Sequence, residues 1–95
     1  MTPPTTTATL PREVLKRSGE RAAFDARKIR SAIERAGAAT GEFGADEAQL
    51  LAAQVGKVLI HRFHGQAPSI EQIQDVVEHT LIAANHLHTA RAYIA

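Results

Sequence analysis

The segment VLKRSGERAAFDARKI, residues 14–29, decides how this chain begins to fold. It contains a Ser-Gly pair at 18–19, which is typical of a tight turn, between two short runs that can form strands. Residues 13–17 and 21–24 are therefore predicted to pair as a β-hairpin. Asp25 follows at once, and its carboxylate can accept the unpaired amides of a first helical turn. The segment thus predicts a hairpin that leads directly into a helix.

The first two helices are predicted from apolar residues that recur with the helical period. The stripe of the first helix has the spacing i, i+3, i+4, i+7 and consists of Ile29, Ala32, Ile33 and Ala36. Gly37 is expected to end this helix in the left-handed cap position, and residues 38–45 are expected to form a loop. The second helix is predicted to begin at a capping box of Asp46 and Gln49 and to reach residues 61–63. Its stripe consists of Leu51, Val55 and Val58.

Two more helices are predicted after a break in the chain at Gly65 and Pro68. Ser69 and Gln72 form a capping box at the start of the third helix, and Asn85 is expected to stop it. The third stripe consists of Ile70, Ile73, Val77, Leu81 and Ala84, and the fourth of Leu87, Ala90 and Ile94. Because four stripes need a common core, we predict a mainly α fold of the α+β class. It is a four-helix bundle capped by a small β-hairpin or three-stranded sheet.

Length and composition restrict the class of protein. The chain has 95 residues, of which 44% are hydrophobic, and this suits one domain with one core. It has no Cys, so disulfides and thiolate zinc sites are excluded. The first residues lack the basic and apolar regions of a secretory signal, and no apolar run is long enough to span a membrane. We therefore expect a cytoplasmic protein.

The two ends of the chain differ from its middle. Residues 1–12 are rich in Thr and Pro, so we expect a flexible tail there and a single domain at residues 13–95. At the other end, the chain stops at Ala95 without a helix stop signal or a charged cap. This ending indicates a piece of a longer protein.

The positive charge of the chain is concentrated in one half. The formal net charge is only +1, but eight of the eleven Lys and Arg residues lie between Arg12 and Arg35, together with four acidic residues. That segment therefore carries a net charge of +4, and the remainder carries −3. A local positive field indicates a local anionic ligand rather than a generally basic protein.

The same segment has features that suit phosphate. A helix N-terminus favours anions because its unpaired amides and its dipole point outward, and Lys28 lies in that first turn. On the predicted strand, Val14 and Lys16 share a face because side chains alternate. A base could therefore lie against Val14 and a phosphate against Lys16, with Arg17 contributing from the end of the strand. The simpler interpretation is that these cations only face solvent.

Four pieces of the sequence together resemble the ATP-cone domain family: VLKRSG, AFDARKI, PSIEQIQDVVEHTL and ARAYI. They occur in the family's order and extend from Val14 to Ile94. ATP-cones are regulatory modules of many ribonucleotide reductases and of a transcriptional repressor of reductase genes. The resemblance implies a non-catalytic module that binds ATP or dATP, with Mg²⁺, and controls the activity and oligomeric state of a reductase. It implies a reductase of the anaerobic or cobalamin-dependent type, with its catalytic domain and a second copy of the module as partners.

The resemblance also implies which residues contact the nucleotide. Three basic residues would meet the phosphates, two apolar residues would wall the adenine, and the start of the third helix would line the other side. In that order they are Lys16, Arg17 and Lys28; Val14 and Ile29; and Ile70 and Gln74. Asp25 would either contact the nucleotide or simply cap its helix.

Other kinds of site have weaker support in the sequence. The chain contains no G-x-x-x-x-G-K-[ST] motif, so it has no P-loop. His61 and His64 lack an evident third ligand, and we therefore predict no metal site. Glu71, Asp75 and Glu78 recur along one predicted helix, where they fit a solvated face better than a catalytic pair. No catalytic constellation is evident, so we do not expect the module itself to be an enzyme.

Three alternatives to reductase regulation remain open. The positive half of the chain could contact nucleic acid, although no recognition-helix pattern accompanies it. A cone taken from the repressor would follow a zinc ribbon, for which this chain has no Cys. The third alternative is a helical oligomerisation module without a ligand, and such a module would be insensitive to ATP.

Overall fold

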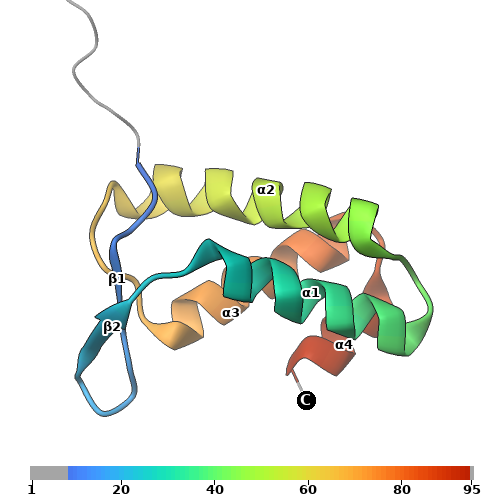
Figure 1. The fold of residues 1–95 in the computed structure, drawn as a ribbon, viewed down its shortest axis with the longest axis horizontal. Coiled ribbons are helices and arrows are strands. Elements are labelled where there is room, and N and C mark those ends of the chain that lie inside the picture. Colours follow the sequence, from blue (N-terminus) through green and yellow to red (C-terminus); the bar gives the residue numbers. More distant parts are fainter. Residues whose placement is uncertain (1–8, 95) are drawn as a thin grey trace, which may run out of the picture.

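A computed structural model describes residues 9–94, which form two short strands and four helices (Figure 1). The elements are β1 (Glu13–Leu15), β2 (Arg21–Ala23), α1 (Ala26–Thr40), α2 (Ala45–Phe63), α3 (Ile70–Ala83) and α4 (Leu87–Ile94). The predicted mainly α fold with a small β-hairpin is thus confirmed. Most of the predicted flexible tail, residues 1–8, lies outside the described residues.

The antiparallel hairpin of β1 and β2 lies at one end of the helices, beside the starts of α1 and α3 (Figure 1). Val14 pairs with Ala22 at its centre. The chain leaves β1 at Lys16, whose amide donates to the Glu20 carbonyl at 2.8 Å. This bond continues the register of the hairpin, but β1 ends at Leu15 and Arg17 lies in the turn, so the prediction that Lys16 and Arg17 both lie on the first strand was wrong.

A further segment adjoins the hairpin without forming a full strand. The amide of Leu15 donates to the carbonyl of Pro68 at 2.9 Å, and Leu15 forms a parallel bridge with Ser69. At the open end of the hairpin, the amide of Phe24 donates to the carbonyl of Arg12 at 2.9 Å and extends the pairing of the two strands. The contacts of Leu15 hold the hairpin against the start of α3.

The start of α1 confirms the predicted cap. Asp25 is extended (φ −132°), and its Oδ1 accepts a hydrogen bond from the amide of Arg27 at 3.0 Å. The predicted stop at Gly37 was wrong, because α1 continues to Thr40 and is capped by Gly41, which is left-handed (φ 76°). The loop before α2 is therefore shorter than the predicted residues 38–45. Gly37 is instead buried inside the helix, where the ring of Phe43 occupies the space of a Cβ atom.

The start of α2 differs from the prediction, whereas its end agrees. The N-cap is Gly44, which makes no side-chain cap, so the predicted capping box of Asp46 and Gln49 was wrong. Asp46 lies in the first turn, where a negative charge is favourable to the helix dipole. The helix ends at Phe63, as predicted, and His64 follows in the left-handed conformation (φ 49°).

The start of α3 is the predicted capping box. The Ser69 hydroxyl accepts from the Gln72 amide at 3.1 Å, and the Gln72 side chain accepts from the Ser69 amide at 2.9 Å. After the end of this helix, Asn85 has a positive φ of 67°. That conformation turns the chain into α4 and confirms the predicted stop.

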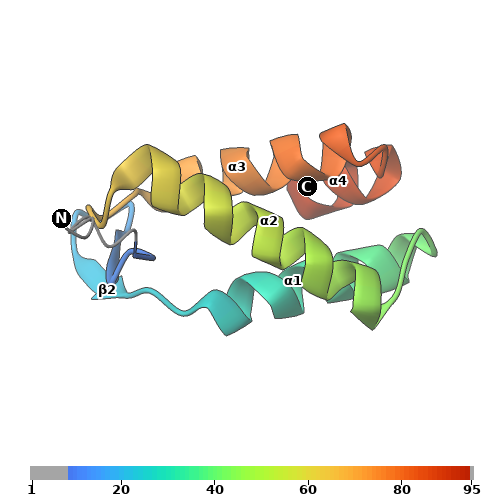
Figure 2. The ribbon, with the colours of Figure 1, turned by 90° about the horizontal axis from the view of Figure 1, so that it is seen from above.

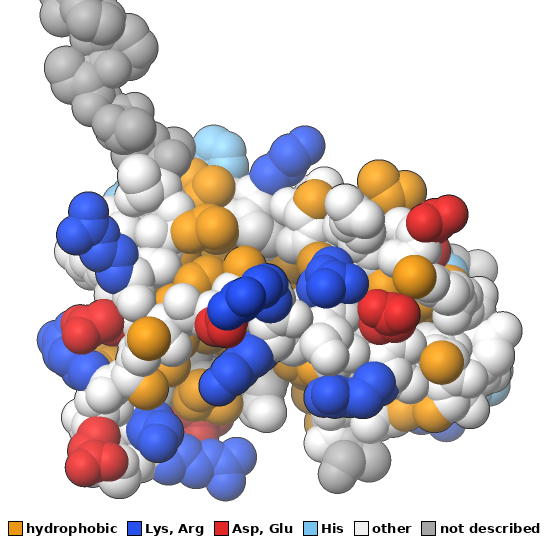
Figure 3. Space-filling model, in the orientation of Figure 1, with side chains coloured by type: hydrophobic (Ala, Val, Ile, Leu, Met, Phe, Trp, Pro, Cys, Tyr) orange, Lys and Arg blue, Asp and Glu red, His pale blue; other side chains and the backbone are white. Residues whose placement is uncertain are grey.

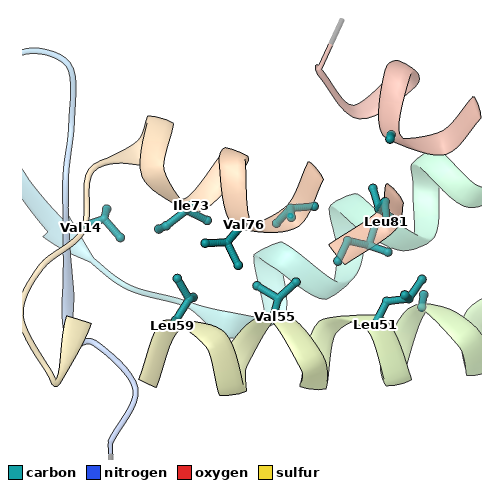
Figure 4. Packing of buried hydrophobic residues seen from close by; sticks show 11 residues of the cluster. Val14, Leu51, Val55, Leu59, Ile73, Val76 and Leu81 are labelled. Atoms are coloured by element: carbon teal, nitrogen blue, oxygen red, sulfur yellow. The ribbon is translucent and has the colours of Figure 1, made fainter. Parts of the chain in front are cut away.

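The helices enclose an apolar core that extends to the hairpin. Figure 2 shows α2 lying across the space between α1 and α3, and α4 packs against α1 and α3. In Figure 4, Val55 and Leu59 of α2 point toward Val76 of α3, and Val14 of β1 lies at the hairpin end of the same cluster. The core therefore fixes the position of the hairpin relative to the bundle. Among the described residues, no helix is both long enough and apolar enough to cross a membrane.

Candidate functional site

A pocket of about 260 Å³ opens between the hairpin and the helix bundle. Its walls come from both strands, the starts of α1 and α3, and the end of α4. The residues that line it are Val14, Lys16, Ala22, Ala23, Phe24, Asp25, Lys28, Ile29, Ile70, Ile73, Gln74 and Tyr93. Segments from the beginning, middle and end of the chain thus meet at one site.

All but one of the residues predicted to bind a ligand line this pocket. Val14 and Lys16 both line it, which agrees with the argument that they share a face. The exception is Arg17, whose Nε lies 2.7 Å from Oε2 of Glu71 at the start of α3. The structure therefore gathers the predicted residues of the hairpin, α1 and α3, and places Arg17 on an acidic partner outside the lining.

The sequence did not predict five of the lining residues, which are Ala22, Ala23, Phe24, Ile73 and Tyr93. Phe24 and Ile73 fit the apolar pattern of a core, so they gave no separate sign of a binding site. Tyr93 is part of the ARAYI motif, which is the signal that could have identified it. Only the packing of α4 against α1 and α3 brings its ring to the hairpin.

The pocket combines apolar walls with two available cations. Val14 is only 7% exposed, whereas the side chains of Lys16 and Lys28 are exposed. Among the described residues, neither lysine forms an ion pair. Figure 3 shows Lys and Arg side chains gathered over the hairpin and α1, with hydrophobic side chains between them. Such a site can hold a flat apolar ring against its walls and an anionic group beside it.

Asp25 mainly stabilises the start of α1. Its carboxylate accepts from the guanidinium and the amide of Arg27, and these bonds hold the pKa of Asp25 below its usual value. The amide of Lys28 donates to the carbonyl of Asp25 at 3.1 Å. Because these two amides are already bonded, the ammonium of Lys28 is the favoured group through which α1 meets an anion.

Tyr93 is positioned by contacts at the opposite end of α4. The carboxylate of Glu42, in the loop after α1, accepts from the amides of His88 at 3.3 Å and Thr89 at 2.9 Å, and from the Thr89 hydroxyl at 2.6 Å. The hydroxyls of Thr89 and Thr40 are 2.8 Å apart. A carboxylate from another element therefore caps the helix that carries Tyr93. Burial raises the pKa of Tyr93, as expected for a ring packed against the core.

Three other hollows among the described residues are larger than the hairpin pocket. One of about 410 Å³ between α2 and α3 is mostly apolar. In another of about 380 Å³ between α1 and α2, Arg27 and Arg30 are paired with carboxylates, and Lys57 has no carboxylate partner among the described residues. In a third of about 390 Å³ beside the hairpin, Arg21 pairs with Glu13, and Arg12 has no carboxylate partner within residues 9–94. We select the hairpin pocket because it combines apolar walls with two such lysines, and not for its size.

Comparison with known proteins identifies the family of the chain. The family model described as the ATP cone domain matches residues 12–95, which is nearly the whole chain. Over 81 residues the chain is 36% identical to the anaerobic ribonucleoside-triphosphate reductase of Haemophilus influenzae. That match covers 85% of this chain and only 11% of the reductase. On the extent of the family match and the identity to this relative, the chain belongs to the ATP cone domain family.

Proposed function

We propose that this domain binds ATP or dATP in the pocket between the hairpin and the bundle, and that the bound nucleotide regulates a ribonucleotide reductase. Membership of the ATP cone family and the similarity to an anaerobic reductase support this proposal. The observation that carries it is the convergence of seven predicted nucleotide-binding residues on one pocket with apolar walls and two unpaired lysines. A reductase relative also favours this assignment over the transcriptional repressor.

In the proposed complex the adenine ring lies against the apolar walls, between Val14 and Ile29 on one side and Ile70 on the other. The pocket is slightly smaller than the roughly 300–1,000 Å³ that is typical of sites for drug-sized ligands. The base and ribose would fill it, and the phosphates would extend past Lys16 and Lys28 toward solvent. Mg²⁺ would accompany the triphosphate and reduce its charge.

The proposed ligand contacts several elements of the fold at once. The pocket is shared by the hairpin, α1, α3 and α4, so a bound nucleotide links all four. ATP and dATP differ only at the ribose 2′-hydroxyl, and they can act as opposite signals only if each stabilises a different conformation or assembly. A coupling of roughly 1–3 kcal/mol is sufficient for such a switch. In this proposal the module performs no catalysis, which belongs to the rest of the parent protein.

Calorimetric titration with ATP, dATP and adenosine, in the presence of Mg²⁺, tests this function. Light scattering on the same samples reports any change in mass. We expect saturable binding of both nucleotides, a difference in affinity between them, and a change in mass with one. GTP is the control for recognition of the base. Absence of heat and of any change in mass with ATP and dATP would contradict the proposal and favour a helical module without a ligand.

A further inference from the structure

An ion pair connects the hairpin turn to α3 at the edge of the proposed nucleotide pocket. Arg17 Nε lies 2.7 Å from Glu71 Oε2, although the two residues are 54 positions apart in the chain. Their preceding neighbours, Lys16 and Ile70, both line the pocket. The pair therefore bridges two of the elements between which the nucleotide is proposed to lie.

Glu71 is well suited to hold a cation in this position. Its pKa is held below the usual value, first by a hydrogen bond from its own backbone amide and then by Arg17, so the side chain is ionised near neutral pH. The side chain of Arg17 is 78% exposed and that of Glu71 is 50% exposed. An ion pair this exposed changes an equilibrium by only about two- to fivefold. A triphosphate, which carries more charge than one carboxylate, can therefore replace Glu71.

We propose that Glu71 is an internal competitor of the nucleotide phosphates: it holds Arg17 in the unliganded domain, and a triphosphate takes Arg17 from it. This inference rests on the proposed function. It explains how Arg17 can be a phosphate-binding residue although it does not line the pocket. Glu71 then lowers the affinity for charged nucleotides without changing the affinity for the nucleoside. The exchange also releases the hairpin turn from α3 when a triphosphate binds.

The substitution Glu71→Gln tests this role because it removes the charge and retains the shape of the side chain. Titrations of ATP and adenosine into both proteins at low salt should show about two- to fivefold tighter binding of ATP and no change for adenosine. In an Arg17→Ala background the same substitution should have no effect beyond that of the control. The control is Glu78→Gln, which removes one negative charge from the same helix about 10 Å farther along.

Several outcomes would overturn the inference. Equal affinity for ATP in Glu71→Gln and the unsubstituted domain would show that no competition exists. Weaker ATP binding would show that Glu71 organises the hairpin, and equal gains for ATP and adenosine would show a general effect on the pocket. If the unsubstituted domain binds neither ATP nor dATP, the proposed function itself fails and this role fails with it. Should Glu71→Gln not fold, Glu71→Asp serves instead, because its shorter side chain weakens the contact with Arg17 and should also tighten ATP binding.

Discussion

Lys16 and Lys28 differ from the other charged residues near the pocket, because neither has an acidic partner within residues 9–94. Asp25 is bonded to Arg27, and Arg17 is bonded to Glu71. A paired cation must first be released before it can bind a ligand, whereas an unpaired one is available at once. At the scale of residues, the two lysines are therefore the first candidates for phosphate recognition.

Replacing Lys16 or Lys28 by Ala should weaken ATP binding about five- to tenfold and leave adenosine binding nearly unchanged. The reason is that each lysine offers a charge-assisted hydrogen bond to phosphate, and its exposure to solvent reduces the strength of that bond. Calorimetry with both ligands measures the difference. Lys57→Ala on the exposed surface of α2 is the matched control. An equal loss of affinity for ATP and adenosine would refute the phosphate role.

Within α1, a glycine occupies position 37, although glycine is unfavourable inside a helix, because a side chain of the following loop packs against this position. Glycine inside a helix is unfavourable by roughly 0.5–1 kcal/mol relative to alanine, yet Gly37 lies buried in α1. The ring of Phe43 occupies the place where a Cβ would stand. Phe43 also lies 4.6 Å from the ring of His86, measured between centroids, so the ring is held from both sides. Position 37 therefore requires glycine because the Phe43 ring packs against it, although glycine does not favour the helix.

The substitution Gly37→Ala should therefore lower the free energy of unfolding by about 1–3 kcal/mol, because the added methyl group must displace the Phe43 ring. Gly56→Ala is the matched control in α2, since its Cβ would meet Leu10 at an ordinary 3.6 Å. That variant should raise the free energy of unfolding by about 0.5–1 kcal/mol. Urea unfolding followed by circular dichroism measures both. If the two variants were equally stabilised, Phe43 would not be held in place as described.

Across the whole molecule, Glu42 and Tyr93 connect the two ends of the bundle through α4. Glu42 caps this helix beside the loop between α1 and α2, and Tyr93 lines the pocket at the hairpin end. The hydrogen bond from the Thr89 hydroxyl, followed by those from the backbone amides, holds the pKa of Glu42 below its usual value of 4.5. Glu42 is thus bonded to Thr89, four residues before Tyr93 on the same helix, and we expect its charge to influence the position of Tyr93.

The pH dependence of stability should reveal this cap. Because the pKa of Glu42 is lower in the folded state, the unfolded state binds more protons in acid, and stability rises with pH through this range. The contribution of Glu42 is complete above about pH 4.5 and is lost as the pH falls through its folded-state value. The melting temperature of Glu42→Gln should therefore fall less between neutral and acidic pH than that of the unsubstituted domain. Parallel profiles for the two proteins would contradict this.

Glu42→Gln should also weaken the binding of ATP and of adenosine by similar factors, each of about twofold or more. A weaker cap loosens α4 and therefore the Tyr93 wall, which would contact the base and not the phosphates. In a Tyr93→Ala background the same substitution should have little further effect, since residues coupled through one element are not additive. Titration of the single and double variants measures this coupling. Fully additive losses would show that Glu42 does not act through Tyr93.

Much of the fold could be predicted from the sequence because it depends on near neighbours, whereas most of the site residues were predicted from the resemblance to the ATP-cone family. The Asp25 cap and the Ser69–Gln72 capping box each involve residues at most three positions apart. The alternation of side chains placed Val14 and Lys16 on one face, and both line the pocket. The wrong predictions, which are a first strand that reaches Arg17, a helix stop at Gly37 and a capping box at Asp46, used equally local signals.

The sequence by itself determined the helical class, most helix ends and the hairpin turn. Only the tertiary structure decided which distant side chains meet. Arg17 and Glu71 are 54 positions apart, and Glu42 and Thr89 are 47 apart. Helix periodicity and capping act over a few residues, so they specify each element but not its neighbours. Of the stripe predicted for the last helix, Ala90 is buried, whereas Leu87 and Ile94 are exposed. Packing of α4 against α1 and α3 brings Tyr93 to the hairpin and so completes the pocket.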